Sequence, residues 1–409
     1  MLKEDRISGS QAFNLLVITV MGTEILIFPS FAARGAGVDA WLVPAVALVG
    51  ALLVVLAQIR LAANFPGQTV AQYSRLVLGN LPGRLVSLAY AWFFLHLAAL
   101  VLRRFGGLME TVFLRETPLV VILLVMGILA VSAVRNGLGC LARVNELIAA
   151  IVVAAVLILL SLIAKELDIS SLQPVLAAGF LPLLRSAAVP IAWYGEVVVL
   201  LYIIPHLQKP ERGTTIVLAV LLVSAAFFTI STMASIMLFG PDGTARMAFP
   251  FVSLARMVRI AFFERLEAVI MGIWVGGIFV KIALFLWCCV VSLGQAFNLQ
   301  EYRPLIPPLG VLLVILALLS GESLLELNDF LLHSFPLYGL LFEFFLPLFL
   351  LLAANIRARL DPAFPKKPST LILSMLKFPC RKPWPACVNF PARLDSTTAR
   401  GYYRVKLQK

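Results

Sequence analysis

The sequence predicts an all-α integral membrane protein with ten transmembrane helices, arranged as two inverted repeats of five. Hydrophobic residues make up 61% of the 409 residues and charged residues only 13%, whereas soluble domains carry roughly 45–50% apolar and about 25% charged residues. Several apolar segments are long enough to cross a bilayer, which takes about 20 residues. Two of them carry a glutamate beside a glycine, at corresponding places in the two halves of the chain.

Seven apolar segments are predicted to span the bilayer without interruption. They are residues 41–59, 85–102, 118–134, 147–164, 216–240, 304–321 and 335–356. Three further segments contain one charged residue each: 11–33 with Glu24, 186–205 with Glu196 and 268–297 with Lys281. All ten are expected to be helical, because backbone polar groups cannot remain unpaired in lipid.

The termini are predicted to share the cytoplasmic side, because the number of spans is even. The N-terminus lacks the layout of a cleaved signal peptide, so the first span is expected to stay in the mature protein. Residues 1–358 form the predicted membrane domain, and residues 359–409 form a basic, proline-containing tail that we expect to be disordered. Twelve of the 33 lysines and arginines lie in residues 357–409, which favours a cytoplasmic tail near anionic lipid.

The order of the spans predicts an internal repeat, over about residues 8–165 and 180–358. Spans four and nine begin at prolines, Pro118 and Pro304, and spans five and ten begin at Leu147 and Phe335, at nearly the same separation. Five spans per half would invert the second half in the membrane. Inverted repeats of this kind occur in transporters whose ligand lies near the bilayer midplane, between two discontinuous helices.

Spans one and six carry the signals of such discontinuous helices. Span one reads VMGTEILIFPSF, with Glu24 shortly after Gly22, and span six reads VPIAWYGEVVVLLYIIP, with Glu196 directly after Gly195. A proline lies within a few residues of each glutamate. Glycine and proline cost a helix interior about 1 and about 3 kcal/mol relative to alanine, so interruption of both helices is expected to serve a site.

A carboxylate within a span requires a structural or functional explanation, because insertion of a charge at the bilayer centre costs at least ~2.5–3.5 kcal/mol of free energy. We therefore expect both glutamates to face a polar cavity that could hold an amino group, a cation or a proton. The candidate ligand-binding residues are Gly22, Thr23, Glu24, Trp193, Tyr194, Gly195 and Glu196. The alternative for Glu24 and for Glu196 is a structural ion pair with Lys281, and the alternative for the two aromatic residues is packing.

Lys281 is predicted to support the site as a fixed cation that neutralises Glu24 or Glu196, rather than to contact the ligand. A buried charge without a partner costs far more than a paired one. His96 and Glu343 are weaker candidates, since neither belongs to a motif. Two connections, residues 103–117 and 249–265, carry arginines that we expect to anchor the membrane surface.

The sequence contains none of the motifs that would indicate an enzyme. It lacks H-E-x-x-H, a phosphate-binding glycine loop of Walker type and a convincing Ser–His–Asp arrangement. Its five cysteines form neither a zinc site nor a disulfide framework. We therefore expect no enzymatic activity, no cofactor and no bound metal, and we attribute the net charge of +12 to the tail rather than to nucleic-acid binding.

Several motifs resemble a known family. The step W-Y-G-E followed by H-L-Q-K-P-E-R is similar to helix six and the next loop of the amino acid–polyamine–organocation (APC) superfamily. The stretch W-V-G-G-I-F-V-K in span eight, followed by a Tyr-Arg-Pro loop, resembles the B subunit of spore germinant receptors. Here these residues are Trp274, Gly277, Phe279, Lys281 and Tyr302, Arg303, Pro304. The resemblance covers roughly residues 5–358.

The resemblance implies a LeuT/APC-like fold and a germinant receptor subunit in the inner membrane of a bacterial spore. Such a subunit binds a small nutrient, for example an amino acid, and works beside an A subunit and a lipoprotein C subunit. The sequence departs from the family at position 24, where a small residue is expected and Glu24 stands. The tail from Asp361 onward is a second departure.

The sequence is also compatible with two other functions. One is a transporter of amino acids or polyamines, coupled to protons through Glu24 or Glu196. The other is a structural membrane subunit with a vestigial pocket. The fold does not decide among them, because one fold hosts many functions.

Overall fold

The protein is described by a computed structural model that covers residues 6–65, 67–257, 266–321 and 323–361. Within these ranges the chain is mostly helical and contains no β-sheet. The helices are α1 (Gly9–Met21), α2 (Glu24–Ala36), α3 (Val43–Asn64), α4 (Val70–Leu78), α5 (Asn80–Leu108), α6 (Leu119–Arg135), α7 (Leu138–Ile163), α8 (Leu181–Gly195), α9 (Leu200–Ile203), α10 (Gly213–Arg246), α11 (Pro250–Met257), α12 (Leu266–Ala296), α13 (Ile306–Leu319), α14 (Leu324–Asp329), α15 (Phe335–Leu340) and α16 (Leu346–Leu360).

The helices are long and apolar enough to make this a multi-pass membrane protein. Seven helical stretches could each cross a membrane by length and composition, and three shorter apolar helices, Gly9–Met21, Leu119–Arg135 and Arg303–Leu319, accompany them. All ten segments predicted as spans lie in helices. The count of ten spans and the division into two repeats remain predictions.

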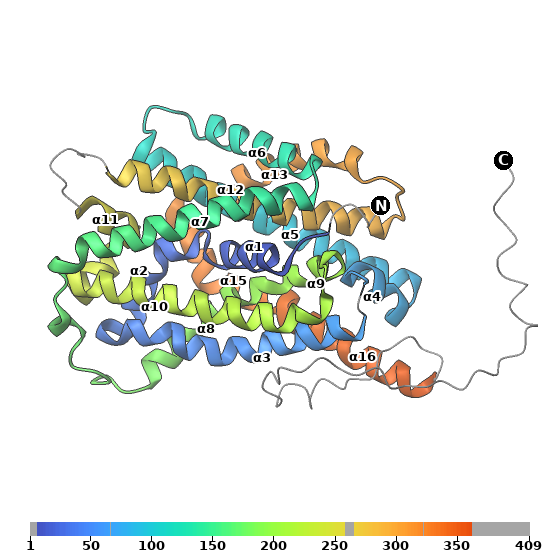
Figure 1. The fold of residues 1–409 in the computed structure, drawn as a ribbon, viewed down its shortest axis with the longest axis horizontal. Helices are drawn as coiled ribbons and strands as arrows, with labels where there is room; N and C mark the ends of the chain where they lie inside the picture. The colour runs from blue at the N-terminus through green and yellow to red at the C-terminus, as the bar shows by residue number, and fades with distance from the viewer. Residues whose placement is uncertain (1–5, 66, 258–265, 322, 362–409) are drawn as a thin grey trace, which may run out of the picture. The chain divides into compact units, whose positions relative to one another are not determined.

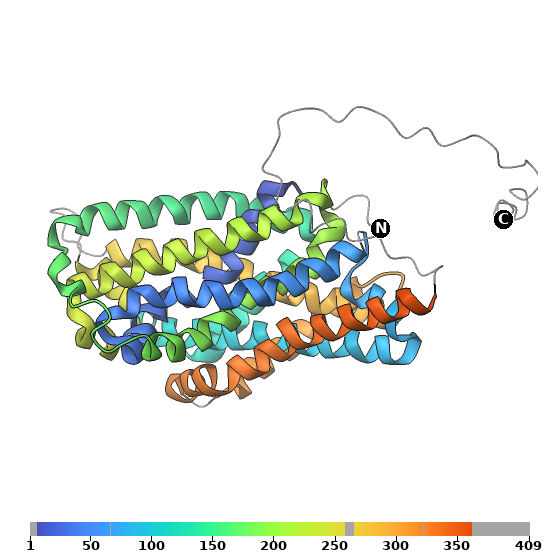
Figure 2. The ribbon, with the colours of Figure 1, turned by 90° about the horizontal axis from the view of Figure 1, so that it is seen from below.

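The long helices lie side by side along the longest axis of the molecule (Figures 1 and 2). Helix α12 packs against α5, α7, α6 and α1, while α10 packs against α2 and α3 against α8. Most of α12 is buried among these neighbours, including every residue from Val280 to Val291. This central position explains why α12 can carry a side chain that reaches the broken helices.

The first span is interrupted as predicted, whereas the sixth is interrupted less. Helix α1 ends at Met21 and α2 begins at Glu24, which leaves Gly22 and Thr23 between them. After Gly195, the chain continues as a 3₁₀ segment, η5 (Glu196–Val199), before the short helix α9. Span six therefore changes its hydrogen-bonding pattern but has no residue between its helical segments, so the predicted unwinding is not seen there.

The predicted arginine-bearing connection at residues 103–117 is wrong in its first part. Helix α5 continues to Leu108, and a π-helical segment, η2 (Met109–Phe113), extends it. Arg103 and Arg104 are both buried, so they do not anchor the membrane surface. In the other connection, Arg256 ends the short helix α11, whereas Arg259 and Arg265, like the tail from residue 362, lie outside the described residues.

The short helix α4 lies in the connection between α3 and α5. A capping box formed by Thr69 and Gln72 begins it. It packs against α5 at Gly83, where an added Cβ would overlap the backbone of Arg75. Ser74 Oγ of α4 donates to the Gly83 carbonyl at 3.1 Å, and Ser87 Oγ of α5 donates to the Ala71 carbonyl at 3.2 Å, which joins the two helices at this contact.

The N-terminal segment is joined to the loop that follows α9. Ile7 N–H donates to the His206 carbonyl at 2.9 Å, and Gln208 N–H donates to the Ile7 carbonyl at 3.0 Å. This isolated parallel bridge pairs Ile7 with Leu207, and both side chains are buried. The start of the chain and the end of span six are thereby held together.

The contact at Gly83 gives a test of the fold. Gly83→Ala is expected to lower the free energy of unfolding by about 1–3 kcal/mol, because the methyl group overlaps backbone atoms that cannot rotate away. Thermal unfolding of the detergent-solubilised protein measures the effect. Gly272→Ala is the matched control, since an added Cβ at Gly272 meets no atom within 4 Å. Equal midpoints for the two variants would contradict the packing described here.

Candidate functional site

Polar side chains form hydrogen bonds to backbone carbonyls at and before the break between α1 and α2. Thr19 Oγ1 donates to the Leu15 carbonyl at 2.7 Å, within the last turns of α1. The Gly22 carbonyl, freed by the break, accepts a hydrogen bond from Trp274 Nε1 of α12 at 2.7 Å. A Cβ at Gly22 would lie 3.1 Å from Lys281 Cδ, so a glycine there leaves room for the lysine stem.

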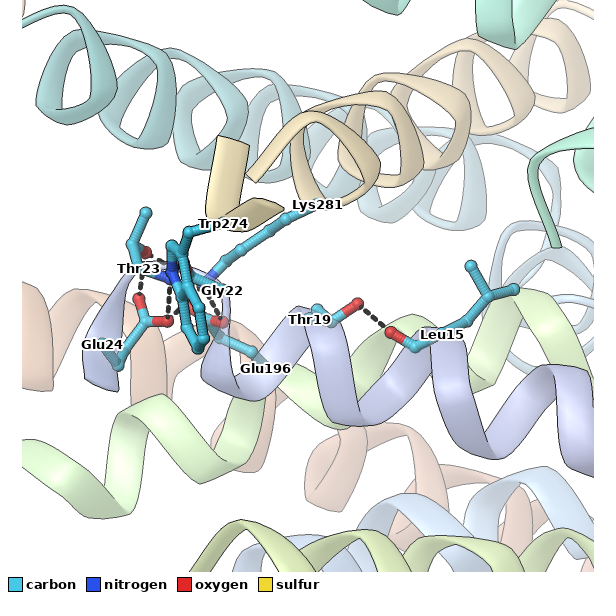
Figure 3. Close-up of polar contacts among 8 residues, drawn as sticks. All are labelled: Leu15, Thr19, Gly22, Thr23, Glu24, Glu196, Trp274 and Lys281. Carbon is cyan, nitrogen blue, oxygen red and sulfur yellow. Dashed lines mark hydrogen bonds and ion pairs between the residues drawn. The ribbon is translucent and has the colours of Figure 1, made fainter. Parts of the chain in front are cut away.

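Lys281 reaches this break from α12 and binds both predicted carboxylates (Figure 3). Its Nζ donates to Glu24 Oε2 at 2.8 Å and lies 2.7 Å from Glu196 Oε2. Thr23 Oγ1 is 3.4 Å from the same nitrogen. The exposed fractions are 0% for Lys281, 4% for Glu24 and 2% for Glu196. Spans one, six and eight therefore meet at one buried cluster of charge.

The two carboxylates are not equivalent. Glu24 accepts hydrogen bonds from Thr23 Oγ1 at 2.7 Å and from Thr23 N–H at 3.1 Å, and it lies in the first turn of α2, where the helix dipole favours negative charge. The contact between Lys281 and Glu196 is close but lacks the geometry of a hydrogen bond, and Glu196 Oε2 accepts none from the described residues. Glu24 therefore has hydrogen bonds from two residues, whereas Glu196 has its ion pair with Lys281.

A second buried cation, Arg104, belongs to the same site. It lies near the end of α5 with 5% of its surface exposed, and it lines a cavity together with Glu24 and Glu196. Its Nη2 donates to Asn328 Oδ1 of α14 at 2.6 Å. With Lys281 and Arg104 opposite Glu24 and Glu196, the formal charge of the cluster is balanced, as a low-dielectric interior requires.

The cavity between these groups has a volume of about 20 Å³, which is room for one water molecule but for no amino acid. Its walls are Thr23, Glu24, Leu97, Leu100, Val101, Arg104, Trp193, Glu196, Leu331 and Phe335. Four of the seven predicted ligand-binding residues thus line it. The structure shows this site in a closed state.

The other three predicted site residues have different surroundings. The Gly22 carbonyl accepts the hydrogen bond from Trp274 Nε1. Tyr194 faces away from the cavity, because its ring packs near Phe228 and its hydroxyl donates to the Pro44 carbonyl at 3.4 Å. Gly195 lies against the carboxyl group of Glu343, which a Cβ at Gly195 would displace.

Glu343, a weak candidate from the sequence, is a fully buried carboxyl beside the site. It lies in the π-helical segment η10 (Leu341–Phe345), and neither of its carboxyl oxygens has a hydrogen-bond partner among the described residues. Gln58 Nε2 holds the backbone around it, donating to the carbonyls of Glu343 at 2.8 Å and Gly195 at 3.2 Å. Glu343 therefore adds an unpaired acidic group behind Gly195.

A larger cavity lies next to Gly22, among α1, α7, α10 and α12. Its volume is about 340 Å³, and most of its wall is apolar, including Met21 and Trp274. Its polar groups, Asn14 and Glu146, belong to α1 and α7. Lys281, Glu24, Glu196 and Arg104 are absent from this wall.

Comparison with known proteins places the sequence among spore germination proteins. Residues 6–323 match a family described as "Spore germination protein". The chain is 29% identical to spore germination protein KB of Bacillus subtilis (strain 168) over 360 residues, which is 86% of this chain and 95% of that protein. It is 25% identical to spore germination protein YndE of the same organism, over 76% of this chain and 85% of that protein.

Solved structures show the same fold in transporters. Mhp1, a nucleobase-cation-symport-1 family transporter in a closed conformation with bromovinylhydantoin bound, matches with a TM-score of 0.58 and 14% identity, over 82% of this chain and 76% of that one. MhsT in complex with L-phenylalanine matches with a TM-score of 0.57 and 16% identity, over 81% of this chain and 87% of that one. At these identities the likeness shows the fold alone.

The shared lysine gives a test of the cluster. Lys281→Met is expected to lower the free energy of unfolding by about 3–5 kcal/mol, because it leaves two buried carboxylates without their cation. Adding Glu24→Gln or Glu196→Gln should recover part of the loss, and adding both should recover more than either. The measurement is the folded yield and thermal midpoint of each variant in detergent.

The control for this series is Lys209→Met, which removes an exposed lysine and should change neither quantity. If neutralising the two glutamates recovers nothing in the Lys281→Met background, Lys281 is not their partner.

Proposed function

The chain belongs to the spore germination protein family, and we propose that it is a germinant receptor subunit: it binds a small nutrient such as an amino acid in its transporter-like site and triggers germination. The family, the fold and the buried charges at the break between α1 and α2 support this proposal. The observation that carries it is the meeting of Glu24, Glu196 and Lys281, because ionisable groups buried within a membrane protein usually serve a function.

The unequal pairing of the two glutamates suggests how a ligand is recognised. Lys281 pairs with both carboxylates, but the pair with Glu196 lacks hydrogen-bond geometry, and Glu196 Oε2 accepts no hydrogen bond among the described residues. The ammonium group of an amino acid supplies both a positive charge and hydrogen-bond donors. We therefore assign Glu196 the contact with the ligand's amino group, and Lys281 the supporting charge that keeps Glu24 in place.

The small cavity beside Glu196 is consistent with a receptor whose site opens when the nutrient binds. Because the space beside Glu196 holds only one water, a nutrient can enter only if a wall moves. A ligand that binds the open state alone shifts the population toward it. In this proposal the shift is read by an A subunit and a lipoprotein C subunit, in the inner membrane of the spore, with both termini of this chain in the cytoplasm.

A proton-coupled transporter of amino acids or polyamines is the second candidate, and Glu343 favours it. A fully buried carboxyl without hydrogen-bond partners among the described residues is a possible proton carrier beside the site. Two observations favour the receptor instead: the family is named for germination, and Lys281 already supplies a permanent positive charge between the carboxylates, so no coupling ion is needed there.

Deletion of the chain tests the proposed function. Spores that lack it are expected not to germinate on at least one nutrient of a panel of amino acids and sugars, while uptake by vegetative cells stays normal. The measurement is the loss of optical density that accompanies germination. Normal germination on the whole panel would remove the receptor proposal.

Complementation then tests the site. The wild-type chain should restore germination, whereas Glu196→Gln, at the same membrane level, should raise the required nutrient concentration by about tenfold or more, since a hydrogen bond to a charged group contributes roughly 1.5–3 kcal/mol. Glu211→Gln, at an exposed glutamate, is the control.

For the transport candidate, vesicles that contain the purified chain should accumulate labelled amino acids or polyamines under a proton gradient, and Glu196→Gln should abolish this accumulation.

A further inference from the structure

Arg104 stands apart from the other charged groups of the site. It is 95% buried, as its exposed fraction of 5% shows, and it faces the same cavity as Glu24 and Glu196. Nevertheless, it makes no ion pair within the part of the chain that the structure describes. The hydrogen bond that it donates to a side chain goes to Asn328 Oδ1, an uncharged acceptor.

This partner is weaker than the one a buried guanidinium prefers. A carboxylate matches the planar fork of arginine with two parallel hydrogen bonds, and these are roughly twice as strong as bonds between neutral groups. Neither nearby carboxylate pairs with Arg104: Glu24 binds Thr23 and Lys281, and Glu196 lies against Lys281. Within the described part of the chain, the site therefore holds a cation without a carboxylate partner.

Resting on the function proposed above, we propose that Arg104 binds the carboxylate of the nutrient, and that this carboxylate replaces the side-chain oxygen of Asn328 as the acceptor. The same molecule then meets a guanidinium at one end and Glu196 Oε2, which lacks a hydrogen-bond donor, at the other. Arg104 and Glu196 carry opposite charges and line the same small cavity, and such a pair selects a compact zwitterion. The ligand class is therefore an α-amino acid with both groups free.

The exchange at Arg104 also makes room for the ligand. Asn328 lies in α14, and the residues that follow it, Leu331 and Phe335, form one wall of the cavity. While Arg104 holds Asn328, this wall stays against α5 and the cavity holds one water. When the ligand's carboxylate replaces Asn328 as the acceptor for Arg104, α14 loses this hydrogen bond to α5 and is released. Binding of the carboxylate and opening of the cavity are then the same step.

The preceding residue, Arg103, provides a matched control. It has the same side chain, the same helix and the same exposed fraction of 5%. Its Nε donates to the Gly321 carbonyl at 3.1 Å, and it does not line the cavity. Loss of Arg103 should therefore affect the fold but not the recognition of a carboxylate.

The experiment uses the purified full chain in lipid nanodiscs and two sets of probes: the twenty proteinogenic L-amino acids, and the L-amino acid amides that lack the α-carboxylate. The wild type should be stabilised against heat by at least one amino acid, at about tenfold lower concentration than by its amide. Arg104→Gln should abolish this preference for the acid, and Arg103→Gln should keep it.

Asn328→Asp provides a variant that keeps Arg104 in place, in case Arg104→Gln does not fold. The new carboxylate should occupy Arg104, weaken binding of the amino acid by about tenfold, and leave binding of the amide unchanged. An acid preference that survives in Arg104→Gln, or amino-acid affinity unchanged by Asn328→Asp, would overturn the role of Arg104 and leave the receptor function standing. Failure of the wild type to respond to any of the twenty amino acids would overturn the amino-acid ligand class and the role of Arg104, whereas the receptor function itself is decided by the germination of the deletion spores.

Discussion

The structure depends on one constraint, which is that two carboxylates and one ammonium group are buried together in the interior, each with 4% or less of its surface exposed. Lys281 satisfies this constraint from the centre of α12, and its reach requires a glycine at position 22. The break between α1 and α2 places Glu24 at a helix start, and Trp274 satisfies the carbonyl that the break exposes. The packing of spans one, six and eight around each other follows from these contacts.

Much of this site could be predicted from the sequence, because charge in an apolar segment is rare and must find a partner. Glu24, Glu196 and Lys281 interrupt three long apolar runs, and this pattern predicts that the lysine neutralises Glu24 or Glu196. In the structure Lys281 contacts both. The helical fold was predictable for the same reason, since unpaired backbone groups are excluded from lipid.

Other parts could not be predicted, because the pattern of residue types does not give the direction of a side chain. Arg103 and Arg104 follow an apolar run and look like its surface end, yet α5 continues and both are buried. Tyr194 stands next to Trp193 in the sequence but faces away from the cavity. In span six, Gly195 signals an interruption, whereas its actual role is to leave space for Glu343, a residue far away along the chain.

The bridge between Ile7 and Leu207 links the N-terminal segment, which precedes span one, to the end of span six. It thereby joins the two spans that carry the carboxylates. Separating them breaks two peptide hydrogen bonds, and each contributes a net of only about 0.5–1.5 kcal/mol. In the proposed receptor, any motion that parted spans one and six would have to supply this free energy in addition to the cost of opening the cavity.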